Sequence, residues 1–346
     1  MGSPARYAYL HGRTSVMAAR LLSASQLQSL IQLPLGQEVE VLRAAGIIGF
    51  QPGEPSIAPR SREQRLITVL LDDLVILSRA LSGEGRSFLL YWAYRFELSN
   101  LKTILRGKLN AQDATTIREQ LVDMGPFARL PTEELLRTED VAELLRQLES
   151  TAFADIARQA RRIFEERHES FALDAAIDRQ YYAGLAMRAL SAEGGSSTQL
   201  RALIGSIFDR MNLLWLLRYR FAYGLSSAET YYLLIPSTFR LGSRELLALS
   251  QLGSFEEVIA HLPAPFSEWL AGTVNASDVT YILERESWRQ AESVLRRSAF
   301  NLARAFAYLI LRERDLRWVR AAIKGKRLKV APELIREATG ISAALE

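Results

Sequence analysis

The sequence predicts an all-α protein, and three observations carry this prediction. The 11 prolines leave three long intervals free of proline, between Pro59 and Pro126, between Pro131 and Pro236, and between Pro265 and Pro332. Because proline in a helix interior costs about 3 kcal/mol, long helices are expected inside these intervals. Within them Ala, Leu, Arg, Glu and Gln dominate, and all five are good helix formers. No stretch shows the alternating pattern and hairpin turns of β-strands.

The N-terminal third begins with short amphipathic helices. Leu27, Leu30 and Ile31 share a face at spacings of three and four, and Val39 and Leu42 follow the turn at 34–36. Ser23 is the expected N-cap of the first short helix. Two long helices are then expected over 62–81 and 87–108, separated by the glycine-containing segment 82–85.

The middle and last thirds follow the same plan. Leucine-rich short helices are expected after the N-cap candidates Thr132 and Ser243. In the middle third, long helices are expected over 153–190 and 198–223, separated by 191–197. In the last third, 279–324 predicts one very long helix or a pair with a bend near Ser298. Proline and glycine mark linkers at 51–60, 124–131 and 235–243.

Composition argues against several functional classes. The 43 basic and 39 acidic residues give a net charge of only +4, whereas nucleic-acid-binding proteins usually carry a larger or more clustered excess. There is no cysteine, which excludes disulfides, a thiol nucleophile and thiolate metal ligands. Charged residues such as Asp72, Asp73 and Arg304 interrupt the apolar runs, and no signal peptide is visible. The expectation is a soluble, intracellular protein.

Residues that could carry chemistry are few and scattered. His11, His168 and His261 lie far apart without a zinc-type spacing, so no metal site and no cofactor are expected. Asp72–Asp73 and Asp174 with Asp178 are interpreted as acids on a solvated or inter-helix face. The pairs Gly107–Lys108 and Gly325–Lys326 lack the order of a phosphate-binding loop. They are expected to close their helices, with glycine as the terminator and lysine complementing the dipole.

A twelve-residue motif occurs three times, about 110 residues apart, at 97–108, 209–220 and 315–326. Each copy begins with an acid and has bases at its tenth and twelfth positions; the acids are Glu97, Asp209 and Asp315, the tenth-position bases Arg106, Arg218 and Lys324, and the twelfth-position bases Lys108, Arg220 and Lys326. A fixed period of this length indicates repeated supersecondary units. We therefore expect three pseudo-symmetric helical repeats over 1–110, 111–224 and 225–346, an arrangement that suits a scaffold or an adaptor.

These residues resemble a family, the C subunits of prokaryotic V-type (V/A-type) ATPases, which are the counterparts of the d subunits in eukaryotic vacuolar ATPases. The resemblance spans nearly the whole chain and is carried by four segments: Tyr7–Tyr9 with Arg13, Leu21 and Leu22; Glu97–Lys108; 175–182 with Asp178, Tyr181 and Tyr182; and 313–328. One departure is Trp318, which stands where the terminal motif usually has Asn, the residue found at Asn100 and Asn212. A hydrogen bond between helices is therefore not expected at Trp318.

The resemblance implies a funnel of three similar helical domains on the cytoplasmic face of a membrane rotor ring of proteolipid subunits. The funnel would receive the foot of a central stalk made of the D and F subunits. Such a protein binds no nucleotide, catalyses nothing and passes torque between ATP turnover and proton or sodium transport. Attachment to the membrane would be peripheral, through the ring.

The residues expected to contact these partners lie in the motifs and their flanks. The expected funnel wall comprises Asn100, Lys102, Arg106, Asn212, Arg218, Arg317, Arg320 and Lys324. A second candidate segment contains Tyr7, Tyr9 and Arg13. The alternative is that the acids and bases of the motif only stabilise their own helices, at a few tenths of a kcal/mol per pair.

Three other functions remain open from the sequence. A generic α-helical repeat scaffold that binds other proteins would usually have repeats of about 30 to 50 residues. A nucleic-acid-binding protein with arginine-rich helix ends would bind in a salt-dependent way. An all-α enzyme would need a pocket with perturbed titrating groups.

Overall fold

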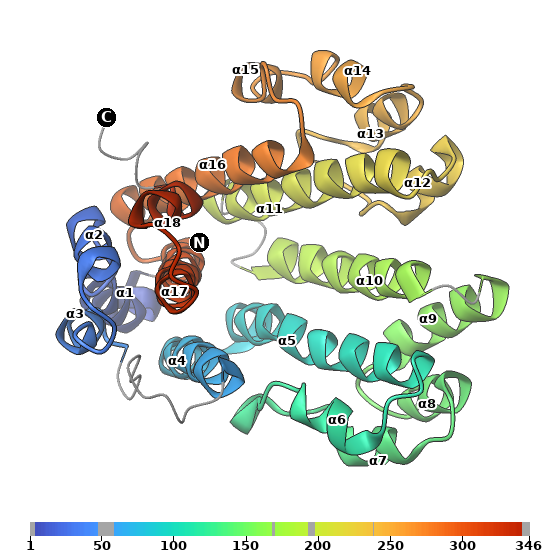
Figure 1. Ribbon diagram of the computed structural model, residues 1–346, viewed down its shortest axis with the longest axis horizontal. Helices are drawn as coiled ribbons and strands as arrows, with labels where there is room; N and C mark the ends of the chain where they lie inside the picture. Colours follow the sequence, from blue (N-terminus) through green and yellow to red (C-terminus); the bar gives the residue numbers. More distant parts are fainter. Residues whose placement is uncertain (1–3, 48–58, 168–169, 193–197, 238, 341–346) are drawn as a thin grey trace. The chain divides into compact units, whose positions relative to one another are not determined.

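The computed structural model confirms the all-α class. It describes residues 4–47, 59–167, 170–192, 198–237 and 239–340. Within these ranges the chain forms helices and turns and no β-strand. The chain folds into two compact units, one made of residues 1–90 and 291–346 and the other of residues 91–290 (Figure 1). The two units do not test the predicted division of the chain into three repeats, which stays a prediction.

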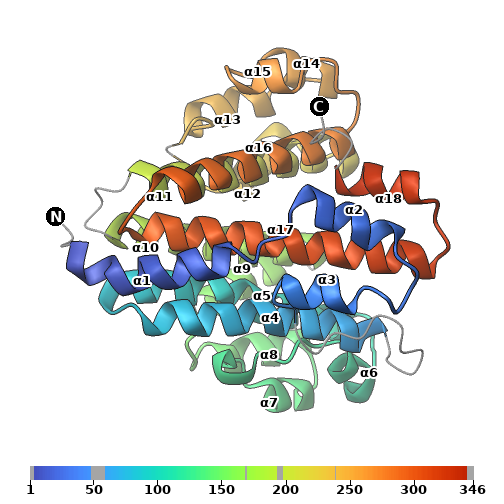
Figure 2. The same ribbon diagram turned by 90° about the vertical axis from the view of Figure 1, so that its left-hand side faces the viewer.

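The first unit is built around one long helix, α17 (Leu302–Arg327). It packs against α1 (Pro4–Ala18), α2 (Ala24–Gln32), α4 (Pro59–Arg79) and α18 (Pro332–Thr339), as Figure 2 shows. The short helix α3 (Val39–Ala44) contacts α2. Because neighbours surround α17, apolar residues occur all round it and side chains such as Phe306 and Leu309 are fully buried.

The second unit contains the remaining helices. Most of α5 (Gly83–Leu109) belongs to it, followed by α6 (Ala114–Glu119), a 3-10 turn η1 (Gly125–Phe127), α7 (Thr132–Arg137), α8 (Val141–Leu148), α9 (Ala154–Arg167) and α10 (Ser170–Ser191). Then come α11 (Thr198–Leu217), a π-helical turn η3 (Arg218–Ala222), α12 (Ser227–Leu233), α13 (Ser243–Ser250), α14 (Phe255–Ala260), α15 (Phe266–Trp269) and most of α16 (Ala276–Arg297).

Aromatic side chains fill much of the core of the second unit. Tyr91 stacks on Tyr94 and on Tyr181, at centroid distances of 5.6 and 5.4 Å. The hydroxyl of Tyr181 donates to the carbonyl of Trp92 at 3.0 Å, so this buried phenol is hydrogen-bonded. Gly184 lets α10 approach α5 closely, since a Cβ there would lie 2.1 Å from the Tyr91 hydroxyl. These aromatics belong to helical packing within the unit.

The predicted helix starts are correct at one position of three. Ser23 caps α2 through a capping box with Gln26. Thr132 and Ser243 are instead the first helical residues, because Pro131 and Gly242 hold the N-cap positions. Neither of those two caps makes a side-chain hydrogen bond. Polar residues at a helix start therefore predicted the boundary to within one residue but not the capping contact.

The predicted long helices differ from the structure mainly at their breaks. Within the span 153–190 the structure describes two helices, α9 to Arg167 and α10 from Ser170, and residues 168–169 lie outside the described residues. The span 279–324 is two helices, with the break at 298–301 between α16 and α17, so the alternative with a bend near Ser298 is the correct one. α5 begins at Gly83, inside the segment expected to separate two helices. Most of the linker expected at 51–60 lies outside the described residues.

None of the described helices has the length and apolar character that crossing a bilayer requires.

Candidate functional site

The acid that opens each motif lies buried in its unit and accepts backbone N–H groups. Glu97 accepts from the amides of Arg129 at 3.0 Å and Leu130 at 3.3 Å. In the second copy Asp209 accepts from Leu241 at 3.0 Å. In the third copy Asp315 accepts from Leu22 at 2.7 Å. Leu130, Leu241 and Leu22 each directly precede the N-cap residue of a short helix, α7, α13 and α2 respectively.

The base that closes each motif binds carbonyls at the other end of the same short helix. Lys108 donates to the carbonyl of Leu136, in the last turn of α7, at 3.3 Å. Lys326 donates to Leu30 and Leu33, at the end of α2, at 2.7 and 2.9 Å. Arg220 donates to Leu252, just past the end of α13, at 3.2 Å.

We call this arrangement the helix clamp: a motif acid at the N-terminal end of a short helix and a motif base at its C-terminal end. Glu97 and Lys108, like the other two pairs, are 11 residues apart. Eleven residues bring a helix back to nearly the same face, roughly 16 Å further along its axis. Each short helix thus has a carboxylate near its positive end and a cation near its negative end, as its dipole favours.

The third copy of the motif differs from the other two at the fourth position, where it has Trp318 in place of asparagine. The Asn100 side chain makes two bonds with the backbone of Val122, both at 2.7 Å. Asn212 makes the same pair of bonds with Ile235, at 3.0 and 2.8 Å. At Trp318 the Arg314 guanidinium lies over the indole, 4.2 Å from the ring centroid. Asn100 and Asn212 are both buried, and their amides tie loops to α5 and α11.

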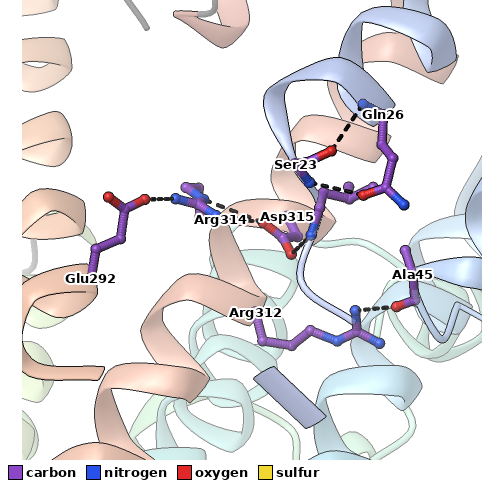
Figure 3. A network of polar contacts seen from close by, with 8 residues as sticks. Ser23, Gln26, Ala45, Glu292, Arg312, Arg314 and Asp315 are labelled. Carbon is purple, nitrogen blue, oxygen red and sulfur yellow. Dashed lines mark hydrogen bonds and ion pairs between the residues drawn. The ribbon is translucent and has the colours of Figure 1, made fainter. Parts of the chain in front are cut away.

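The third clamp joins the two ends of the chain within the first unit. Asp315 and Leu22 are 293 residues apart in sequence. Figure 3 shows Asp315 between the segment that leads into α2 and Arg314, whose guanidinium also pairs with Glu292 at 2.5 Å. Arg312, nearby on α17, donates to the carbonyl of Ala45 at 2.7 Å. A single helix, α17, therefore fixes α2 and the segment after α3.

Gly107 and Gly325 do not close their helices, contrary to the sequence interpretation. Both lie inside helices that continue to Leu109 and Arg327. A Cβ at Gly107 would lie 2.5 Å from Ile117, and one at Gly325 would lie 2.6 Å from Ile335. The two glycines are needed because a neighbouring isoleucine packs directly against the helix backbone.

Burial changes the proton affinity of the clamp acids. Desolvation raises the pKa of Asp209 to about 6, against the lowering effect of the Leu241 amide bond. Desolvation also raises the pKa of Asp315 to about 6, although Arg314 and the Leu22 amide lower it. The pKa of Glu97 is raised for the same reason. The three carboxyls share an environment that fits a structural role.

Two predicted funnel-wall cations form ion pairs between α5 and α10 of the second unit. Lys102 binds Asp178 at 2.7 Å, with both side chains largely buried. Arg106 binds Asp174 through Nε at 3.0 Å, and its side chain is 55% exposed. Asp174 and Asp178 thus lie on an inter-helix face, one of the two placements expected for them. Arg218, also in this unit, is exposed and donates to the Tyr223 hydroxyl.

The other predicted contact residues lie in the first unit. Tyr7 is buried, whereas Tyr9 is 58% exposed and its hydroxyl accepts from Arg13 at 2.9 Å. Along α17, Arg317 is 3.5 Å from Glu313, and Arg320 is 3.6 Å from Glu63. Lys324 is exposed and makes no ion pair with any described residue.

The sequence located the motif residues but did not predict which backbone groups most of them bind. The signal that could have revealed the clamp is a second similar spacing: Glu97 precedes Leu130 by 33 residues, and Asp209 precedes Leu241 by 32. It also missed the buried pair of Arg312 and Asp73, 2.9 Å apart, to which the Tyr308 hydroxyl donates at 2.7 Å.

The described residues contain no group of three or more His, Asp or Glu side chains that could hold a metal ion. His11 stacks on Phe300 at a centroid distance of 4.6 Å, and His261 contacts the carbonyl of Glu257 at 2.8 Å. His168 lies outside the described residues.

Comparisons with known proteins agree over almost the whole chain. The model of the family described as ATP synthase (C/AC39) subunit matches residues 10–338. The C subunit of the A-type ATP synthase of Methanocaldococcus jannaschii is 23% identical, over 96% of this chain and 86% of that protein. Its counterpart in Halobacterium salinarum is 23% identical over 96% of this chain and 97% of its own length. For that of Thermococcus kodakarensis the values are 23%, 96% and 90%.

Proposed function

Because this chain belongs to the ATP synthase (C/AC39) subunit family, we propose that it is the non-catalytic protein that joins the central stalk of a rotary ATPase or ATP synthase to its membrane rotor ring. The observation that carries the proposal is the extent of the family match, residues 10–338 of 346. Relatives named as C subunits of A-type ATP synthases also align along nearly their full lengths. Torque would then pass through this chain between ATP turnover and proton or sodium transport.

The helix clamps support the mechanical part of this proposal. A coupling element has to transmit force without rearranging, so its short helices must be held firmly on its long ones. Each clamp holds a short helix at both ends, through a buried carboxylate such as Asp315 and a cation such as Lys326. Buried charge-assisted hydrogen bonds of this kind are stronger than neutral ones and fix geometry.

The clamps also support the proposal of three pseudo-symmetric repeats. The same acid and base positions hold a short helix in each motif copy. In this proposal each repeat pairs a motif helix with one short-helix segment, and the third repeat takes its segment from the N-terminus. The predicted boundaries at 110 and 224 would accordingly shift, because α5 and α11 hold segments that follow them in sequence.

The stalk-binding surface is proposed to use the exposed members of the predicted set. These are Tyr9, Arg13, Arg106, Arg218, Arg317, Arg320 and Lys324. Asn100, Asn212 and Tyr7 would act indirectly, since they are buried and hold the backbone or pack within their units. The D and F subunits would be the stalk partners, and the proteolipid ring would provide peripheral attachment at the cytoplasmic face of the membrane.

Native mass spectrometry of the purified chain with the central-stalk D–F pair of its host tests the proposal. The expected result is a complex with one copy of each protein. Lys324→Glu together with Arg320→Glu should weaken that complex at least tenfold, because both side chains are exposed and one lacks a described ion-pair partner. Arg146→Glu, an exposed arginine on α8, is the matched control and should leave the complex unchanged.

Absence of any complex at tens of micromolar, with the chain folded and helical, would overturn the stalk-binding proposal. Equal binding by the double variant and by wild type would reject the α17 cations as contacts while keeping the stalk as a partner. Pull-down of unrelated proteins in place of the stalk would favour the general scaffold function.

A further inference from the structure

The second unit contains a cavity of about 510 Å³ that opens to solvent. Its walls come from α11, α15 and α16 and from the segment before α13, elements that can be followed in Figure 1. The volume lies within the range of about 300–1,000 Å³ that is typical of small-molecule sites. Neither the clamp contacts nor the proposed stalk contacts account for this space.

Part of the cavity wall is apolar and aromatic. Phe266 and Trp269 of α15 meet edge to face, 5.5 Å apart, and Leu283 of α16 lies among the lining residues. Phe239 packs on α11 because position 205 is glycine, where a Cβ would lie 2.7 Å from its ring. Replacing Gly205 would therefore displace an aromatic wall of the cavity. The apolar part of a ligand would find aromatic faces on more than one side.

The polar lining carries an excess of positive charge. Four arginines line the cavity, Arg201, Arg210, Arg240 and Arg289, against two acids, Asp209 and Glu286. Arg289 pairs with Glu286 at 2.7 Å, and Arg210 lies 3.6 Å from Glu284. Arg201 and Arg240 are exposed and make no ion pair with a described residue. Arg201 is thus available to a ligand, and Arg240, whose charge also lowers the pKa of the Asp209 carboxyl, supplies a second exposed guanidinium.

Three of the remaining polar groups are already hydrogen-bonded within the unit. The hydroxyl of Ser206 donates to the carbonyl of Leu203 at 2.9 Å, and that of Ser287 donates to Leu283 at 2.9 Å. The Asp209 carboxylate accepts the Leu241 amide in the second clamp. None of these groups is placed as a nucleophile, so the cavity fits binding and not catalysis.

We propose that this cavity binds a soluble amphipathic anion, with its carboxylate, sulfonate or phosphate at Arg201 and Arg240 and its apolar body against Phe239, Phe266 and Trp269. Guanidinium groups suit oxyanions because they offer paired N–H donors in a planar fork. Sugars fit such a site less well, because their hydroxyl groups would be left without partners against the aromatic walls. The site is independent of the proposed stalk function.

Isothermal titration with 8-anilino-1-naphthalenesulfonate, an aromatic sulfonate, tests the proposal on the full chain. The expected result is one site per chain, with energy transfer to the bound dye from the tryptophans of the unit, Trp269 among them. The double variant Arg201→Gln, Arg240→Gln should bind at least tenfold more weakly. Ala202→Trp, which changes an exposed lining residue, should block the mouth and abolish binding without altering the core. Arg86→Gln, an exposed arginine of the first unit, is the charge-matched control and should bind as wild type does.

Decanoate, which has a carboxylate and a flexible chain, should displace the dye. No binding at millimolar dye, or several weak sites that none of the variants changes, would overturn the proposal. The chain could instead float with phosphatidylglycerol vesicles while decanoate fails to displace the dye. That result would show that the arginines bind a membrane surface, and it would also overturn the proposal.

Discussion

Two glycines of the motif helices owe their positions to a neighbouring side chain. Gly107 and Gly325 lie within helices, where glycine costs about 1 kcal/mol relative to alanine. This cost is offset by the close packing of Ile117 and Ile335, branched residues that leave no room for a Cβ. The sequence suggested helix ends at both positions, because a glycine followed by a lysine after an apolar run is typical of a C-terminus.

Gly325→Ala should therefore destabilise the chain by about 2 kcal/mol, since overpacking a close contact costs roughly 1–3 kcal/mol. Gly12→Ala is the matched control, because Gly12 lies in α1 with nothing within 4 Å of the Cβ position. That substitution should be neutral or stabilising. Urea unfolding measures both free energies. If Gly325→Ala proved as stable as wild type, the close contact with Ile335 would not determine the residue.

The raised pKa of Asp209 predicts a pH-dependent contribution to stability. Its pKa is about 6 in the folded chain against a reference value of 3.8, so between these values the folded state binds more protons. This carboxyl therefore makes the chain less stable as pH rises from 4 to 6, by up to about 3 kcal/mol. Asp209→Asn keeps an acceptor for the Leu241 amide but cannot ionise. The unfolding free energy of this variant relative to wild type should increase by roughly 2 kcal/mol between pH 4.5 and 7.5.

Asp113→Asn is the control for this pH series. Asp113 caps α6, and hydrogen bonds from Thr116 lower the pKa of its carboxyl below 3.8. This carboxyl is therefore largely ionised over pH 4.5–7.5 in both the folded and the unfolded chain, so the difference from wild type should stay nearly flat over that interval. A flat difference for Asp209→Asn as well would show that the folded pKa of Asp209 is close to its ordinary value.

At the scale of elements, the short helices depend on the motif helices that hold them. Lys326 binds the two carbonyls at the end of α2 and the carboxylate of Glu38, which is fully buried. Lys326→Met would leave that carboxylate without its cation, and breaking a buried pair in this way costs about 3–5 kcal/mol. Calorimetric or urea unfolding should show a loss of this size. Lys324→Met, two residues away on the same helix, should change stability by less than about 0.5 kcal/mol because its side chain is exposed.

Adding Glu38→Gln to Lys326→Met should recover part of the lost stability, because the uncompensated charge is then removed. If the double variant were no more stable than Lys326→Met alone, the lost stability would come from the missing hydrogen bonds to the carbonyls and not from the broken ion pair.

How much of the fold and of the candidate site could be predicted depended on how close in sequence the interacting residues lie. Helix class, helix spans and the acid and base positions of the motif follow from local propensity and spacing, and Ser23 was found as a cap. The division of the span 153–190 between α9 and α10 was not predicted, because the sequence around residues 168–169 contains neither proline nor glycine. The partners of Glu97, Asp209 and Asp315 were missed because they lie 32 to 293 residues away. Without those partners the motif indicated helix-stabilising pairs or contacts with another protein equally well.

At the scale of the whole molecule, the first unit consists of the two ends of the chain and the second of one continuous segment. The core of the first unit contains N-terminal side chains such as Tyr7, Leu10, Leu27 and Leu30 packed with α17. Each such side chain contributes about 1.5–3 kcal/mol on burial. Together they are on the order of 10 kcal/mol, comparable to the whole stability of a typical domain.

Deletion of residues 1–47 should therefore unfold the first unit while the second stays folded. Hydrogen exchange followed by mass spectrometry is expected to show fast exchange in α17, which loses α1, α2 and the third clamp, and unchanged protection in α11. Adding the 1–47 peptide to the truncated chain should restore protection of α17, because Leu22 and Glu38 again meet Asp315 and Lys326. Slow exchange of α17 without the peptide would mean that its remaining neighbours, α4 and α18, are enough to keep it folded. Fast exchange of α11 in the truncated chain would mean that the continuous segment cannot fold alone, and the two units would then be one cooperative structure.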